Sequence, residues 1–249
     1  MKKSLFLVPF AALTLSACGY SVFDAADDIQ SSDSGFAGGK SITDSAATTA
    51  AFTKLEASGP DNIVFITGDS FSIKAEGEAG AIAKLRYKIE DGAIMIGREK
   101  GKYWGKDSKG VTITVTAPAL AEASLAGSGN FTADKMTGDK IVLEIAGSGN
   151  LSVADMIGKE LESDIAGAGN VKLAGKVDSV DYDIAGSASI DAIKLAATNA
   201  DVSVAGSGDV LLTATGKVDA NIAGSGNITV VGGAKCSSST IGSGSISCS

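Results

Sequence analysis

The sequence predicts an all-β protein, a right-handed parallel β-helix-like solenoid whose rungs are 18–20 residues long. A glycine-rich motif, Ala-Gly-Ser-Gly-Asn or a variant of it, recurs seven times from residue 125 onward. The first glycines of the copies are spaced 20, 20, 19, 20, 18 and 18 residues apart, at Gly127, Gly147, Gly167, Gly186, Gly206, Gly224 and Gly242. A nearly fixed period of this length is typical of solenoids, in which each repeat stacks on the next.

Apolar and polar residues alternate on both sides of each glycine motif. Around Gly167, for example, apolar side chains stand at Leu161, Ile165, Val171 and Leu173. Period-two alternation indicates strands with one buried face, so each copy is expected to be a strand, a glycine-rich corner, a second strand and a looser turn. Stacking such rungs about 4.8 Å apart would bury a column of small aliphatic side chains, and right-handed connections are favoured between parallel strands. An up-and-down antiparallel barrel is the alternative, because its strands also alternate.

Residues 1–17 have the features of a signal peptide. Two lysines precede an apolar run that ends in Leu-Ser-Ala-Cys at Cys18, and the run is too short to span a bilayer. The last four residues resemble the bacterial lipoprotein box, which implies that Cys18 becomes the lipid-modified first residue of the mature protein and attaches it to a membrane. Gly19, rather than Asp, follows the cysteine, which favours the outer membrane of a Gram-negative cell. The alternative is an ordinary secreted protein with a cysteine there by chance.

The lipidated cysteine and the residues after it, 18–50, are expected to form a flexible tether. They are rich in Ser, Ala, Asp, Gly and Thr and show no sustained apolar periodicity. The alternative is that residues 40–43 pair as an edge strand.

Residues 51–249 are expected to form one solenoid domain. Between 51 and 120 the sequence contains strand-like runs at 63–67, 71–74, 94–96 and 111–116, which we interpret as earlier, less regular rungs. A short helical turn fits within residues 79–89.

Composition excludes several functions. The 249 residues include no His, only two Arg, and 29 acidic against 21 basic residues, for a net charge of −8. Without His, a Ser-His-Asp or Cys-His nucleophile and a His-bound zinc are impossible, and the sequence indicates no cofactor and no metal. The acidic balance argues against nucleic acid, whose phosphates require clustered cations.

Cys236 and Cys248 stand six residues before and six residues after Gly242, in columns that face inward in the other rungs. They belong to the last copy of the motif, and we expect a disulfide between them to close its end. Closing a loop of this length would stabilise the fold by about 3 kcal/mol. Two buried free thiols are the alternative.

Acidic residues fill two columns that face outward, three and five residues before the first glycine. The members are Glu144, Asp164 and Asp183 in one column and Glu162, Asp181, Asp201 and Asp219 in the other. Stacked carboxylates repel one another unless they are solvated or bridged by a cation such as Ca²⁺. We expect a solvated polar face, with calcium bridging as the alternative.

Two further features are candidates for binding or for structure. The segment 98–109 is the one basic patch, and it contains Tyr103 and the only tryptophan, Trp104. An exposed aromatic among cations could stack on a sugar or meet lipid phosphates, although such a loop more often packs on the end of a core. The motif asparagines, Asn130, Asn150, Asn170 and Asn227, are expected to form a hydrogen-bonding ladder along the corners.

The order of these features resembles a known family. A signal segment, Ser58-Gly59, residues 114–118 and the Gly-Ser-Gly-Asn series are similar to the putative auto-transporter adhesin, head GIN domain family, over residues 51–246. The sequence departs from that pattern at Ala188-Ser189, where the second glycine and the asparagine are replaced. The resemblance implies a secreted or surface-associated β-helical protein without enzymatic activity.

The function expected from the sequence is that of a non-enzymatic, membrane-anchored envelope lipoprotein with an adhesin-like or structural role, whose partner is a surface polysaccharide or a protein. The alternative is a polysaccharide-acting β-helix enzyme, a lyase or a hydrolase. A lyase would require Arg or Lys near a cation site, and both arginines, Arg86 and Arg98, lie outside the regular rungs.

Overall fold

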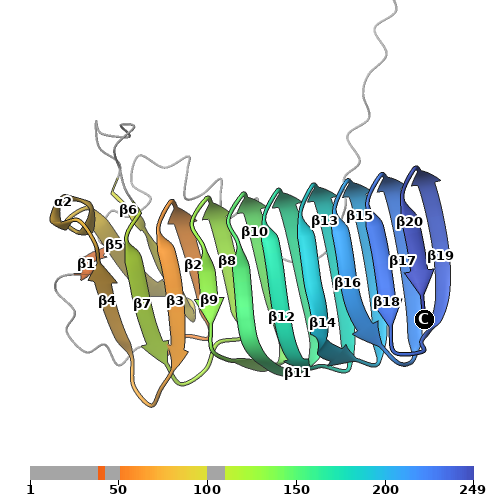
Figure 1. The fold of residues 1–249 in the computed structure, drawn as a ribbon. Coiled ribbons are helices and arrows are strands. Elements are labelled where there is room, and N and C mark those ends of the chain that lie inside the picture. The colour runs from red at the N-terminus through yellow and green to blue at the C-terminus, as the bar shows by residue number, and fades with distance from the viewer. Residues whose placement is uncertain (1–38, 43–50, 100–109) are drawn as a thin grey trace, which may run out of the picture.

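The structure is a computed structural model that describes residues 39–42, 51–99 and 110–249. These residues form a long parallel β-solenoid, in which the rungs stack along one axis (Figure 1). The strands are β1 (Lys40–Ser41), β2 (Lys54–Gly59), β3 (Asn62–Thr67), β4 (Ser72–Glu76), β5 (Leu85–Glu90), β6 (Ala93–Arg98), β7 (Thr112–Ala117), β8 (Glu122–Gly127), β9 (Phe131–Ala133), β10 (Met136–Gly147), β11 (Leu151–Gly167), β12 (Asn170–Lys176), β13 (Ser179–Gly186), β14 (Ser189–Ala197), β15 (Asn199–Gly206), β16 (Asp209–Ala214), β17 (Lys217–Gly224), β18 (Asn227–Val231), β19 (Lys235–Gly242) and β20 (Ser245–Cys248). The one helix of these described residues, α2, spans Ala79–Ile82, within the range expected for a helical turn.

The repeats build two facing rows of parallel strands joined at the glycine corners. Before the corner, β8, β10, β11, β13, β15, β17 and β19 pair in that order. After the corner, β9, the first part of β11, β12, β14, β16, β18 and β20 pair in that order. Because every pairing between these repeats is parallel, the solenoid prediction is confirmed and the antiparallel barrel is wrong.

The corners stay in register although the rungs differ in length. Each corner glycine pairs with the corner glycine of the next rung, from Gly127 to Gly242. The register shifts occur on the opposite side, for example between Val153 and Met156 and between Ala192 and Ala196. The variation between 18 and 20 residues is therefore absorbed away from the corners.

The rungs of the N-terminal part do not stack in the order in which they occur in the sequence. The rung of β2 and β3 lies between the rung of β6 and β7 and the rung of β8 and β9. The strands β4 and β5 run antiparallel to β7 and β6, and β4 is the last strand of its row, whereas β5 is followed by β1. The tether prediction is wrong for residues 40–42, because β1 pairs antiparallel with β5 and Ile42 is buried. The edge-strand alternative holds there.

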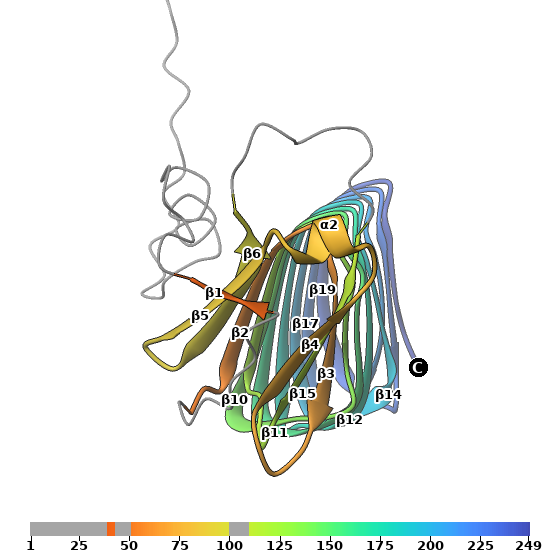
Figure 2. The ribbon, with the colours of Figure 1, turned by 90° about the vertical axis from the view of Figure 1, so that its left-hand side faces the viewer.

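Aromatic side chains pack against one another at this end of the solenoid, the end that faces the viewer in Figure 2. Phe71 contacts Phe52 edge-on at 5.6 Å between ring centroids and lies 6.1 Å from Tyr87. Phe131 and Tyr182 are buried further along the column.

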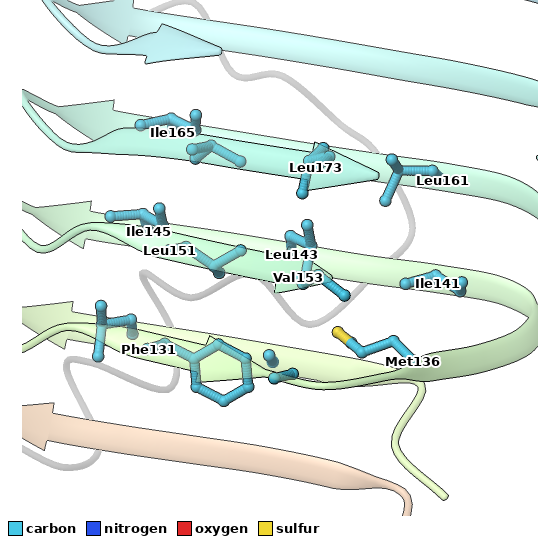
Figure 3. Close-up of a cluster of buried hydrophobic side chains, with 14 of the residues drawn as sticks. Phe131, Met136, Ile141, Leu143, Ile145, Leu151, Val153, Leu161, Ile165 and Leu173 are labelled. Atoms are coloured by element: carbon cyan, nitrogen blue, oxygen red, sulfur yellow. The ribbon is translucent and has the colours of Figure 1, made fainter. Parts of the chain in front are cut away.

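The interior is a continuous aliphatic column (Figure 3). Residues of the same repeat position lie above one another, as Ile145 and Ile165 do, and both are 2% exposed. Phe131 and Met136 fill the wider layer near the first repeats and are equally buried. Each fully buried aliphatic side chain contributes about 1.5–3 kcal/mol relative to exposure, so the column is the main source of stability.

The corner glycines are required by both conformation and space. Gly167 has φ +139°, which side chains with a Cβ rarely adopt. A Cβ on Gly167 would also overlap the backbone carbonyl of Gly147 on the preceding rung. Gly59 shares the positive φ, at +112°, but a Cβ there would meet nothing within 4 Å.

We therefore predict that Gly167→Ala costs more stability than Gly59→Ala. Conformational strain alone should cost about 1–3 kcal/mol at either position, and overlap with the neighbouring rung should add about 1–3 kcal/mol at Gly167. Urea unfolding of the two variants measures both costs. Equal losses would show that rung contact does not dictate the corner glycines.

Candidate interaction surfaces

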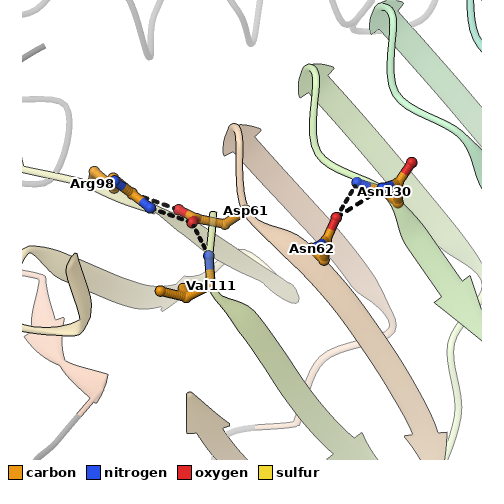
Figure 4. A network of polar contacts seen from close by, with 5 residues as sticks. All are labelled: Asp61, Asn62, Arg98, Val111 and Asn130. Atoms are coloured by element: carbon orange, nitrogen blue, oxygen red, sulfur yellow. Dashed lines mark hydrogen bonds and ion pairs between the residues drawn. The ribbon is translucent and has the colours of Figure 1, made fainter. Parts of the chain in front are cut away.

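The corners carry a ladder of side-chain amides. The side chain of Asn130 donates to Oδ1 of Asn62 at 2.9 Å (Figure 4), and Asn150 donates to Asn130 and Asn170 to Asn150 in the same way. The predicted asparagine ladder is confirmed for Asn130, Asn150 and Asn170. Asn227 donates to Asp209 in a separate pair, because Ser189 stands at the intervening rung. These amides bond to one another, so the ladder is structural.

Asn62 was missed as the first member of this ladder. It is three residues after Gly59, just as Asn130 is three residues after Gly127, and that spacing was the available signal. The intervening Pro60-Asp61 does not match the Ser-Gly of the later motifs, which hid the relation.

Asp61 forms a buried clamp at the first corner, which the sequence analysis also missed. Its carboxylate accepts from Nε and Nη2 of Arg98 at 2.7 and 2.5 Å and from the backbone N–H of Val111 at 2.9 Å (Figure 4). The side chains of Asp61 and Arg98 are only 5% and 10% exposed. The hydrogen bond to Asp61 raises the pKa of Arg98 above its ordinary value.

The clamp fixes both flanks of the predicted ligand loop. Arg98 ends β6 and Val111 precedes β7, so the two sides of segment 100–109 are tied to the same carboxylate. Arg98 was expected to contribute to a basic patch but is paired with Asp61 instead. Tyr103 and Trp104 lie outside the described residues, as does Cys18.

The predicted acidic columns lie side by side on the outer face of the strands that precede the corners. Glu162 is in register with Asp181, Asp181 with Asp201, and Asp164 with Asp183. At the N-terminal side of this face the charges are partly neutralised, because Lys54 pairs with Glu122 at 2.8 Å and Lys140 pairs with Glu162.

The crowding of these carboxylates raises their pKa values. Partial burial, followed by repulsion from neighbouring carboxylates, raises the pKa of Asp164 and of Asp181 to about 6. Burial likewise raises the pKa values of Glu144 and Asp183, although hydrogen bonds from Ser124 and Ser203 oppose the shift. Within the described ranges, no group of three or more His, Cys, Asp or Glu is placed to hold a metal ion.

The last rung contains the Cys236–Cys248 disulfide, with 2.10 Å between the sulfur atoms. Cys236 is in register with buried Val218, and Cys248 with buried Val230. The bond therefore joins the two strand rows at the C-terminal end of the column.

The fold and these surfaces define a class of protein, a parallel β-solenoid with long, regular outer faces. The chain belongs to the family described as putative auto-transporter adhesin, head GIN domain, whose model matches residues 51–234. Family and fold support a non-enzymatic, adhesin-like role at the cell envelope or surface. In the described part of the chain, no helix has the length and apolar character needed to cross a membrane.

Solved structures of similar proteins show the same fold. A putative adhesin from Bacteroides fragilis NCTC 9343 is 26% identical, with a TM-score of 0.75 over 80% of this chain and 93% of that one. A protein described as a putative lipid binding protein, from Parabacteroides distasonis ATCC 8503, is 25% identical, with a TM-score of 0.64 over 81% and 94%. No curated protein matches the chain in sequence.

The acidic face predicts an unusual pH dependence of stability. The raised pKa values mean that the folded state binds more protons than the unfolded state between about pH 4 and pH 6, so the free energy of unfolding falls as pH rises through this window. We expect the melting temperature to fall by a few degrees from pH 5 to pH 7.5. Thermal unfolding monitored by circular dichroism measures it.

The control is the double variant Asp164→Asn/Asp181→Asn, which should show a smaller fall. Added salt should raise the melting temperature at pH 7.5 more than at pH 5, because it screens the repulsion. A melting temperature that rises from pH 5 to pH 7.5 would contradict this account of the face.

Proposed function

We propose that the protein is a non-enzymatic envelope lipoprotein, anchored in the outer membrane through acylated Cys18, with an adhesin-like body. The body would present its regular faces to a surface polysaccharide or a protein partner. The observation that supports this most is the repetition of the outer face over β11 to β17, along which Glu162, Asp181, Asp201 and Asp219 lie in register on successive rungs. A repetitive surface suits a repetitive or extended partner, since each rung offers a similar contact.

The position of β1 also fits an anchored body. The predicted acyl site precedes Lys40 by 22 residues, and β1 joins the outer strands of the N-terminal end. A chain of that length, if flexible, spans about 25 Å on average. The C-terminal rung would then be the end farthest along the solenoid from the attachment point.

The loop clamped by Asp61 is proposed as a contact site. Trp104 and Tyr103 would stack on sugar rings or meet lipid head groups, with lysines of the same segment nearby. The clamp keeps both flanks of the loop at the first corner, which limits the region that the loop can reach.

The enzyme alternative has less support. A glycosidase uses one pair of carboxylates at a cleft, whereas here carboxylates recur on successive rungs. A lyase would need a cation near the acidic groups that bind substrate, yet Arg98 is paired with buried Asp61 and Arg86 with Glu99 at 2.6 Å. Neither arginine is directed to the acidic columns.

Labelling with an alkynyl fatty acid tests the anchor. Cells producing the full chain should incorporate the label into the wild type and not into Cys18→Ala. The matched control is Cys236→Ala/Cys248→Ala, which should keep the label because those cysteines lie at the other end of the solenoid. Label in Cys18→Ala, or none in the wild type, would contradict the lipid anchor.

Protease treatment of the same intact cells separates anchoring from adhesion. An adhesin-like role requires the body to be cleaved from outside. A labelled protein that is protected until the outer membrane is permeabilised would retain the anchor and contradict the adhesin-like role.

A further inference from the structure

The two ends of the solenoid are built differently. At the N-terminal end, β4 ends one strand row in antiparallel orientation, and β5 followed by β1 ends the other. These strands carry charged residues, including Lys74, Glu76 and the paired Lys88 and Glu90. Charges on outer strands are a common protection against pairing with another chain. This end is therefore closed to further strand addition.

The C-terminal end lacks such protection. Within the described ranges, β19 pairs with β17 alone and β20 with β18 alone, so one edge of each strand has no partner. Lys235, the first residue of β19, is the one charged side chain of β19 and β20, and residues 236–249 contain no Lys, Arg, Asp, Glu or Pro. The pairing of β19 with β17 runs through eight residue pairs without a register shift, so no bulge twists the edge away. A regular edge of this kind is a template for another strand.

The side chains of this rung also differ from those of the other rungs. Directly before the corner glycine, six repeats have Ala, from Ala126 to Ala223, whereas the last has Ile241. Ile241 is 75% exposed, the highest value among the exposed large hydrophobic residues. Ser238 and Thr240 are also exposed, in register with buried Ala220 and Ile222. This end therefore presents an apolar side chain beside a strand edge whose only charged side chain is Lys235, at its first residue.

We propose that a second copy of this chain docks on the edge of β19, so that two solenoids join through their C-terminal rungs. Two β19 edges related by a two-fold axis run antiparallel, and each supplies the backbone donors and acceptors that the other lacks. The partner's Ile241 is buried in the same contact. Because both copies use the same edge, the contact closes on itself and produces a dimer rather than a fibre.

Charge favours a second copy at this end over contact along the sides. The net charge is −8, and the carboxylates in register on the outer face repel an identical face. The C-terminal rung has no acidic side chain, so two copies approach there without that repulsion. The contact does not depend on the lipid anchor, so the inference stands or falls separately from the proposed function.

The test is the oligomeric state of the full chain in detergent, with Cys18→Ser in every sample so that no acyl group contributes. Light scattering corrected for bound detergent should give the mass of two chains at micromolar concentrations. Ser239→Lys places a charge on the β19 edge and should weaken the dimer at least about tenfold. Ser152→Lys is the matched control, because it changes a serine on the inner strand β11, away from both the β19 edge and the acidic columns.

A second variant, Ile241→Asp, changes a side chain that the single chain does not bury and should also give monomers. Circular dichroism confirms that each variant is folded. The proposal is overturned if the wild type has the mass of one chain over the whole concentration range. Binding of an extended peptide by such a monomer would not rescue the proposal. Dimers that persist in Ile241→Asp and in folded Ser239→Lys also overturn it.

Discussion

The close contact between successive glycine corners is the constraint on which the rest of the structure depends. The carbonyl oxygen of each corner glycine accepts a hydrogen bond from the residue after the next corner glycine. Ser148, Ala168 and Ser187 donate to Gly127, Gly147 and Gly167 at 2.8–2.9 Å. A Cβ on these glycines would overlap the neighbouring backbone. The corners therefore fix how the rungs align, and length differences are shifted to the opposite side of each rung.

This alignment has opposite effects inside and outside the solenoid. Inside, it places aliphatic side chains above one another and builds a continuous core in which aromatics such as Phe131 and Tyr182 are few. Outside, it places Asp164 beside Asp183 and Asp181 beside Asp201, and burial and repulsion raise the pKa values of these groups. The same repetition offers an extended surface to a partner. Stability near neutral pH is thus reduced by the feature that makes the surface regular.

The regular half of the fold was predictable because its signals are local and repeated. The spacing from Gly127 to Gly242 and the period-two alternation identified the corners, the parallel strands and the asparagine ladder. The N-terminal half was not predictable in detail, since β2 pairs with β8 across more than sixty residues without a repeated motif to indicate it. The Asp61–Arg98 clamp was missed for the same reason, as it joins residues 37 positions apart. Nothing local in residues 40–41 indicated that they would pair with β5.

Hydrogen exchange of the corner amides tests the role of these contacts most directly. Ser148, Ser187 and Ser207 have exposed side chains in what the sequence presents as glycine-rich turns. If the rungs are held together at the corners, their backbone amides should exchange as slowly as those of the buried strands, because each donates to the preceding rung. If these amides exchange at the rate of an exposed loop, the account is contradicted. The packing of the aliphatic core alone would then determine how the rungs align.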